Sequence, residues 1–118
     1  MNITQYKALT TETVINPIIE YHDEWEIEEF TKEDIAQCEV LIHSYLDTLG
    51  ALSTPTDEAI MAEVEKLVLA LNELSEKTDY AMIETSEREA ICAVIQESAV
   101  DCGLQDVPED VTEQWREW

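Results

Sequence analysis

The sequence predicts a mostly α-helical protein that folds as a small antiparallel helical bundle. Three segments repeat apolar residues every three or four positions, and each has its own start and stop signals. The 118 residues include only two glycines and three prolines. So few turn-forming residues argue against an all-β fold, which needs many tight turns. Short connections between the helices favour antiparallel neighbours.

The first helix is expected over residues 32–49. Thr31 is a good N-cap residue, and the acids Glu33 and Asp34 in the first turn favour the helix dipole. Gly50 follows the last apolar position, and we expect it to end the helix in the left-handed conformation. The apolar positions form one broad stripe, which predicts the buried face. They are Ile35, Cys38, Leu41, Ile42, Tyr45, Leu46 and Leu49.

The second helix is expected over residues 57–77. It begins after Thr56, again with two acids, Asp57 and Glu58, in its first turn. Lys77 is a favourable charge at its C-terminal end. Its apolar stripe predicts a second buried face. The stripe consists of Ile60, Val64, Leu67, Val68, Leu71 and Leu74.

The third helix is expected over residues 86–102. Ser86 and Glu89 have the spacing of a capping box, in which each side chain binds the main-chain N–H of the other residue. Gly103 is expected to stop the helix. Its stripe is shorter than the other two but keeps the helical period. It consists of Ile91, Val94, Ile95, Ala99 and Cys102.

The N-terminal quarter is ambiguous. Residues 1–13 are expected to be a loose arm. For residues 14–30 two structures stay open, because Asn16-Pro17 is typical of a helix start, whereas apolar and acidic residues alternate from Trp25 onward as in a strand. This element is therefore predicted as either a helix or an extended arm or hairpin.

The C-terminal residues are expected to form a short helix after Pro108. Val111, Trp115 and Trp118 are spaced so that they would share one face of it. Two roles are open for the tryptophans, because a chain end frays unless it is tied down. They could cover the open end of the bundle, or they could dock onto a partner or a second copy.

Charge is the most unusual property of the sequence. It has 28 Asp and Glu residues against 6 Lys and Arg, a net charge of −22 and a pI near 4.1. The excess is spread along the chain, and no linker or repeat divides it, so residues 1–118 are interpreted as one acidic helical domain. Such a surface repels nucleic acid and anionic membranes and attracts basic proteins. Solubility alone is the competing explanation of the acidity.

The cysteines and the N-terminus predict a cytoplasmic protein. Cys38, Cys92 and Cys102 are an odd number of thiols in apolar settings, which suits reduced and buried side chains. The residues from Met1 to Leu9 lack the basic and long apolar regions of a signal peptide. No apolar run is long enough to span a bilayer.

No pattern in the sequence indicates catalysis. No two Cys or His residues have a close zinc-binding spacing, and no Glu is followed three positions later by His, as a di-metal helical bundle requires. Two isolated glycines cannot form a phosphate-binding loop. We therefore expect no enzyme activity, no metal site and no cofactor.

The candidate partner-binding stretch lies between residues 20 and 30. It contains six acids, no lysine or arginine, and four large apolar side chains. Aromatic residues are enriched at interface centres, and acids around them steer a basic partner. The competing interpretation packs Tyr21, Trp25, Ile27 and Phe30 on the bundle as its fourth element. The predicted partner-binding residues are Glu20, Tyr21, Asp23, Glu24, Trp25, Glu26, Glu28 and Glu29.

Together these features favour an acidic protein-binding module. The leading hypothesis is an inhibitor or immunity-type protein that covers the basic surface of a partner, such as a nuclease or another nucleic-acid-binding protein. It would bind neither nucleic acid directly nor membrane. The alternative is a homo-oligomeric helical accessory or structural protein without an active site, for which a homodimer is possible.

Overall fold

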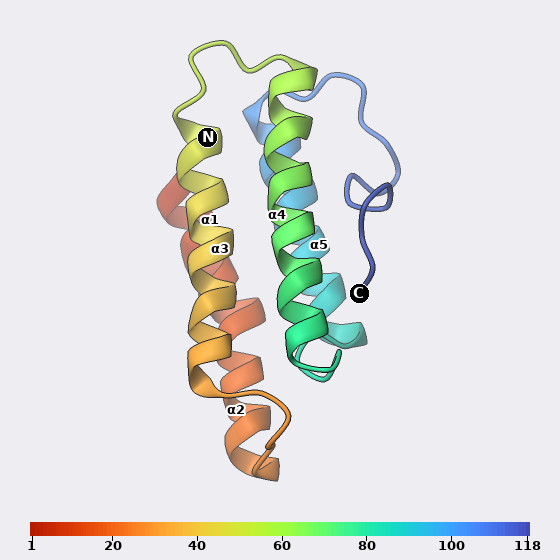
Figure 1. The fold of residues 1–118 in the computed structure, drawn as a ribbon. Coiled ribbons are helices and arrows are strands. Elements are labelled where there is room, and N and C mark those ends of the chain that lie inside the picture. Colours follow the sequence, from red (N-terminus) through yellow and green to blue (C-terminus); the bar gives the residue numbers. More distant parts are fainter.

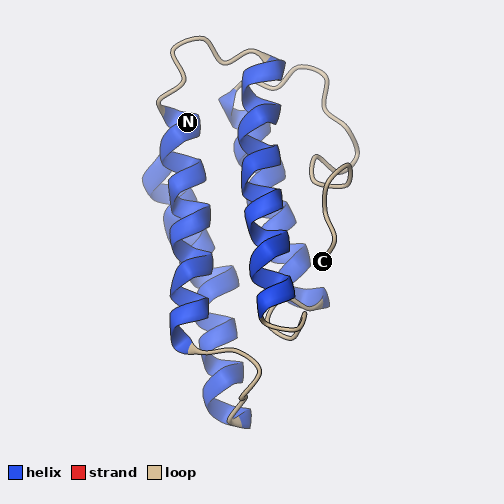
Figure 2. Ribbon diagram, in the orientation of Figure 1, coloured by secondary structure: helices blue, strands red, loops and turns tan.

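Four antiparallel helical rods make up the computed structural model, which describes residues 1–118 and contains no strand (Figures 1 and 2). The first rod is continuous through three elements, the α-helix α1, a π-helical turn η1 and the α-helix α2. The other three rods are single α-helices. The elements are α1 (Ile3–Thr10), η1 (Thr11–Ile15), α2 (Asn16–Trp25), α3 (Lys32–Gly50), α4 (Asp57–Lys77) and α5 (Thr85–Cys102). The predicted helical bundle is therefore confirmed.

The rods form a ring in chain order, each antiparallel to the next (Figure 1). The first rod packs against α3 and α5, and α4 packs against the same two helices from the opposite side. The molecule measures 44 × 27 × 20 Å. α2 extends beyond the ends of the neighbouring helices (Figure 1). One end of the bundle therefore carries a projecting helix terminus.

The three helices expected from periodicity are all present. The caps of α3 and α4 are the predicted ones. The Thr31 hydroxyl accepts the Asp34 N–H at 3.2 Å, and the Asp34 carboxylate accepts the Thr31 N–H at 2.9 Å. The Thr56 hydroxyl accepts the Ala59 N–H at 3.1 Å. These bonds satisfy donors that the helix itself leaves free.

The start of α5 differs from the prediction by one residue. Glu84 is the N-cap, and Glu87 completes the capping box by accepting the Glu84 N–H at 3.4 Å. The expected pair of Ser86 and Glu89 is wrong. Ile83 is buried in the core, so packing fixes where the chain turns into the helix and places Ser86 within the first turn.

Gly50 has a different role from the predicted left-handed cap. It is the last residue of α3, and Ala51 after it keeps a right-handed backbone with φ −90°. An added Cβ at Gly50 would lie 2.9 Å from Cγ1 of Ile3. Glycine therefore allows the start of α1 to approach the end of α3 closely. Gly103, by contrast, does end α5 with a positive φ of 121°, as expected.

Residues 1–13 are not a loose arm. Ile3–Thr10 are α-helical, and Thr10 is fully buried. Threonine is a weak helix former, so helix propensity alone does not predict a helix in the threonine-rich sequence at residues 10–13. In the structure the hydroxyls of Thr10, Thr11 and Thr13 donate back to carbonyls four residues earlier in the helix. Tertiary packing therefore stabilises a helix that local propensity alone would not.

The first rod contains one wider helical turn, the π-helical turn η1. Asn16 donates its N–H to the Thr11 carbonyl, five residues earlier. The wider turn adds one residue to the helical period. Val14, Ile15 and Ile18, in and just after this turn, are all buried in the core.

The ambiguous segment 14–30 is helical as far as Trp25 and is then a loop. The strand alternative is wrong, because Glu26 adopts the left-handed conformation (φ 47°, ψ 51°) and ends α2. The Glu26 N–H donates to the His22 carbonyl. The alternation of apolar and acidic residues belongs to the loop, whose last residue, Phe30, is buried in the core.

The expected C-terminal helix is also wrong. Residues 111–115 form hydrogen-bonded turns, and the segment runs along the outside of α4 and α5 (Figure 1). The Asp110 carboxylate accepts both the N–H and the hydroxyl of Thr112, at 2.9 and 2.6 Å. Val111 and Trp118 are nevertheless buried. The segment therefore covers the α4–α5 side of the bundle.

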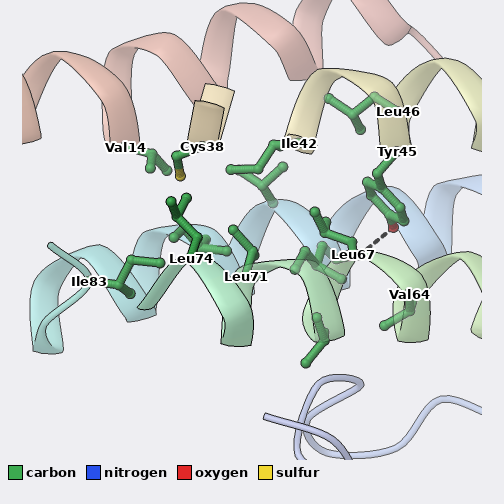
Figure 3. Close-up of a cluster of buried hydrophobic side chains, with 14 of the residues drawn as sticks. Val14, Cys38, Ile42, Tyr45, Leu46, Val64, Leu67, Leu71, Leu74 and Ile83 are labelled. Carbon is green, nitrogen blue, oxygen red and sulfur yellow. Dashed lines mark hydrogen bonds between the residues drawn. The ribbon is translucent and has the colours of Figure 1, made fainter. Parts of the chain in front are cut away.

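The core lies between the four rods (Figure 3). Val14 of the first rod and Cys38 of α3 lie next to one another, with Leu74 of α4 pointing toward them (Figure 3). The Tyr45 hydroxyl lies 2.9 Å from Oγ of Ser98 and donates to the Ile95 carbonyl, so this buried hydroxyl is satisfied. None of the helices combines the length and the apolar character needed to cross a membrane.

Candidate protein-binding surface

The projecting end of α2 and the loop after it form the candidate site. We call residues 20–29 the tip. The last turn of α2 carries its first half, and the loop toward α3 carries its second half (Figure 1). All eight residues predicted to bind a partner lie within the tip, and all eight are exposed to solvent.

The two aromatic residues of the tip are strongly exposed. Trp25 exposes 66% of its surface and Tyr21 exposes 44%. They lie four residues apart in α2, one turn from each other on the same side of the helix. The competing interpretation, in which these rings pack on the bundle, is wrong for both of them. It holds for Phe30, which is buried, and for Ile27, which is half-buried against the core.

Trp25 is exposed because the end of α2 extends beyond the ends of the neighbouring helices. Ile18 is buried in the core, and Trp25 follows it seven residues later, about two turns along the same side of the helix. The apolar stripe that holds α2 against the bundle thus continues past the end of the neighbouring helices. At Trp25 no helix of this chain remains to cover it.

The loop half of the tip is anchored from within. Phe30 exposes only 1% of its surface, and its ring lies 5.5 Å from the His22 ring at an interplanar angle of 49°. The Ile27 N–H donates to the His22 carbonyl at 3.2 Å. Thr31 and Asp34 then fix the start of α3. These contacts hold the exposed acids between them without covering them.

Most of the tip charge has no partner in the chain. Asp23 contacts His22 at 3.1 Å and Lys32 at 3.4 Å, and the hydrogen bond from His22, with the nearby Lys32 ammonium, lowers the pKa of its carboxyl. Lys32 thus neutralises one tip acid, a pairing that no pattern in the sequence indicates. The five tip acids without an ion pair are Glu20, Glu24, Glu26, Glu28 and Glu29.

Five of the six lysines and arginines form an ion pair within the chain, and Arg88 does not. Each lysine already pairs with an acid, and Lys77, for example, lies 3.0 Å from Asp34. Burial alone would raise the pKa of Asp34, but the Thr31 N–H and the Lys77 ammonium outweigh it and hold that pKa below its ordinary value. Arg116 pairs with Asp110 at 3.1 Å. The tip is therefore a local excess of negative charge that the chain itself does not balance.

Grooves between helices are further open features, and two of the three have larger volumes than the third, which is about 220 Å³. One, of about 230 Å³, lies between α3 and α4 and is lined in part by Leu41, Tyr45, Leu67 and Ala70. A wider one of about 580 Å³ lies between α1 and α5, with Tyr6 in its wall. The Tyr6 hydroxyl donates to Asp101 at 3.0 Å, and burial, with this bond, raises the pKa of Tyr6 to about 12.

The thiols lie in settings that favour their protonated form. Burial raises the pKa of Cys38 to about 12 and also raises the pKa of Cys92 and of Cys102. No group of three or more His, Cys, Asp and Glu side chains is placed to hold a metal ion. Comparisons with protein-family models, with curated proteins and with solved structures found no match to this chain. Its function is therefore inferred from its own surface.

Proposed function

We propose that this protein is an acidic protein-binding module that covers the basic surface of a partner, as an inhibitor or immunity-type protein does. A nuclease or another nucleic-acid-binding protein is the natural target, because its surface already attracts anions. The tip is the proposed contact surface. The module would act by occlusion and would need no chemistry of its own.

The exposed indole of Trp25 among unpaired carboxylates is the observation that carries this proposal. A large aromatic ring left 66% exposed is an unused apolar surface. Tryptophan is among the residues most enriched at the energetic centres of interfaces. The surrounding acids disfavour an acidic partner on electrostatic grounds, because like charges brought together cost several kcal/mol, about 2 or more.

The two kinds of tip residue would contribute to different rates. The acids belong to a surface with a net charge of −22, and a field of that sign accelerates encounter with a basic protein. Trp25 and Tyr21 would be buried only after docking, so they would act on the lifetime of the complex. The anchored loop reduces the entropy lost on binding, because the acids are already held near each other.

Affinity capture with three matched baits tests the proposal. The baits are the native protein, a tip variant with Glu24, Glu26, Glu28 and Glu29 changed to glutamine, and a control variant. The control carries glutamine at four exposed acids away from the tip, namely Glu73, Glu76, Glu89 and Glu97. Both variants lose the same charge, so only the position of the loss differs.

The proposal expects a basic protein that the native and control baits retain at low salt and the tip variant does not. Adding the native protein should then inhibit the nuclease activity or the nucleic-acid binding of the captured protein. High salt should release it, because screening weakens charge attraction between exposed groups. Equal capture by the tip and control variants, or capture that is indifferent to salt, would contradict the proposal.

A homo-oligomeric accessory protein is the second candidate. The apolar groove between α3 and α4 favours it, because Leu41 and Ala70 are only half-buried there. A second copy could cover this groove, although two surfaces of net charge −22 repel each other. Light scattering of the native protein at physiological salt separates the candidates. A stable dimer that survives loss of the tip acids would favour the accessory role.

A further inference from the structure

An arginine near the C-terminus shows how this chain itself holds a guanidinium. Arg116 lies over the Trp118 ring, 5.4 Å from its centroid. Its Nη2 lies 3.1 Å from an oxygen of Asp110, and its Nη1 donates to the Trp118 carbonyl at 2.7 Å. The Thr112 hydroxyl accepts from Nε at 3.0 Å. An indole face and a carboxylate together therefore fix the cation.

The tip carries the same two kinds of side chain, an indole and carboxylates, and no cation lies over its indole. Trp25 supplies an exposed indole, and the Arg116–Trp118 contact is the single cation–ring contact in the chain. The one close ring pair joins His22 and Phe30, so neither face of Trp25 is stacked on an aromatic ring. The adjacent residues Glu24 and Glu26 carry carboxylates without an ion pair.

We propose that the tip binds an arginine-bearing segment of a protein partner, with a guanidinium stacked on Trp25 and held by the neighbouring tip carboxylates. This inference rests on the proposed function and adds which basic side chain the site selects. A guanidinium is planar, stacks on aromatic faces and presents paired donors that match a carboxylate, whereas an ammonium is a compact and more strongly hydrated charge. Arginine should therefore bind more tightly than lysine at equal charge.

A second copy of this chain does not fit as the partner. The chain has only two arginines. Arg116 is held by Asp110, Thr112 and Trp118, and Arg88 is half-buried on α5. The net charge of −22 on each copy also opposes self-association. The charge complement of the tip is a basic segment of another protein.

The test compares two synthetic peptides of equal length and net charge, one with arginine and one with lysine as its only basic residue. Their dissociation constants are measured by calorimetry, at low and at physiological salt, with three proteins. These are the native protein, Trp25→Leu, which keeps an apolar side chain but removes the ring, and Tyr80→Leu, a control at another exposed aromatic residue. Circular dichroism checks that each variant is folded.

The native protein and Tyr80→Leu should bind the arginine peptide about fivefold more tightly than the lysine peptide, the scale of a partly exposed cation–ring contact. In Trp25→Leu this preference should disappear, while the remaining salt-dependent binding should be equal for both peptides. The proposal is overturned if the native protein shows no preference, if Trp25→Leu keeps it, or if neither peptide binds.

Failure of this inference and failure of the proposed function give different results. Equal binding of both peptides, together with loss of the captured basic protein in the tip-acid variant, would remove the arginine selectivity and keep the acidic binding module. Loss of both would remove the tip as a binding surface. A dimer of the native protein that dissociates in Trp25→Leu would assign the tip to a second copy and overturn the inference.

Discussion

Asn72 and Glu117 are 45 residues apart in the chain and are joined by a hydrogen bond, in which the Glu117 N–H donates to Asn72 Oδ1 at 3.0 Å. The Nδ2 group of the same side chain donates to the Trp115 carbonyl at 2.8 Å. Asn72 is buried, with 6% of its surface exposed. A single side chain on α4 thus holds the turn-rich C-terminal segment at two main-chain points.

Replacing Asn72 by leucine should reduce the free energy of unfolding by about 2 kcal/mol, because the Glu117 N–H and the Trp115 carbonyl would lose their partners in a half-buried setting. Urea denaturation followed by circular dichroism measures the change. Glu73→Gln, at the next and exposed position of α4, is the control and should change stability little. Two variants of equal stability would mean that water replaces both bonds without cost.

Deleting residues 109–118 should destabilise the fold by about 3 kcal/mol or more, the scale for losing large buried side chains. The deletion removes Val111 and Trp118, which are 1% and 8% exposed, and uncovers the α4–α5 side of the bundle. Thermal unfolding and light scattering are measured together. A truncated protein of unchanged stability and half the native mass in solution would instead assign the segment to a dimer contact.

Trp25→Ala should leave the free energy of unfolding within about 0.5 kcal/mol of the native value, as is usual at an exposed position. Phe30→Ala, five residues later, should cost about 3 to 5 kcal/mol, because Phe30 fills the core beside His22. Urea denaturation of both variants tests the contrast. Unfolding caused by Trp25→Ala would show that the ring packs on the bundle, and the tip would then lose its role as a free surface.

Acid should weaken the attachment of the C-terminal segment. Burial alone would raise the pKa of Asp110, but bonds from Thr112 and Arg116 outweigh it and lower that pKa below the ordinary 3.8. A carboxyl with a lowered pKa in the folded state contributes stability that is complete above the unfolded-state value and is lost as the pH falls through the folded-state value. We therefore expect this contribution to be intact at neutral pH and to disappear below about pH 4.

Asp110→Asn tests the acid prediction. The variant should be less stable than the native protein at pH 7, and the difference should shrink as the pH falls below about 4, where the native carboxyl takes up a proton. Glu113→Gln, an exposed neighbour in the same segment, is the control. Stability is measured by urea denaturation across the pH range. A difference that stays constant down to pH 2 would exclude ionic bonding of Asp110 as its cause.

Sequence alone was enough to predict the three long helices, because their evidence is local. The stripes of α3, α4 and α5 repeat at the helical period, and Thr31 and Thr56 cap the first two through bonds within a few residues of themselves. The sequence also shows directly the high density of acids around Trp25. These amphipathic faces also predict that the buried core lies between the three helices.

Long-range packing decided the features that were predicted wrongly from the sequence. The helix α1 forms in a threonine-rich segment because it packs on α3 and α5. Position 50 requires glycine because Ile3, far away in the sequence, approaches it too closely for a side chain. The C-terminal segment is a set of turns because Asn72 and Gln96, on other helices, bind its main chain. Each of these contacts joins residues far apart in the chain.

The exposure of the tip was likewise decided by tertiary structure. Trp25 lies on the same apolar stripe of α2 as Ile18, and the sequence alone left its ring either packed on the bundle or exposed to a partner. Whether such a stripe is covered depends on the length of the neighbouring helices. The acids of residues 20–29 were therefore determined by the sequence alone. The exposure of Trp25 beside them was decided by the fold, because the end of α2 projects beyond the helices against which it packs.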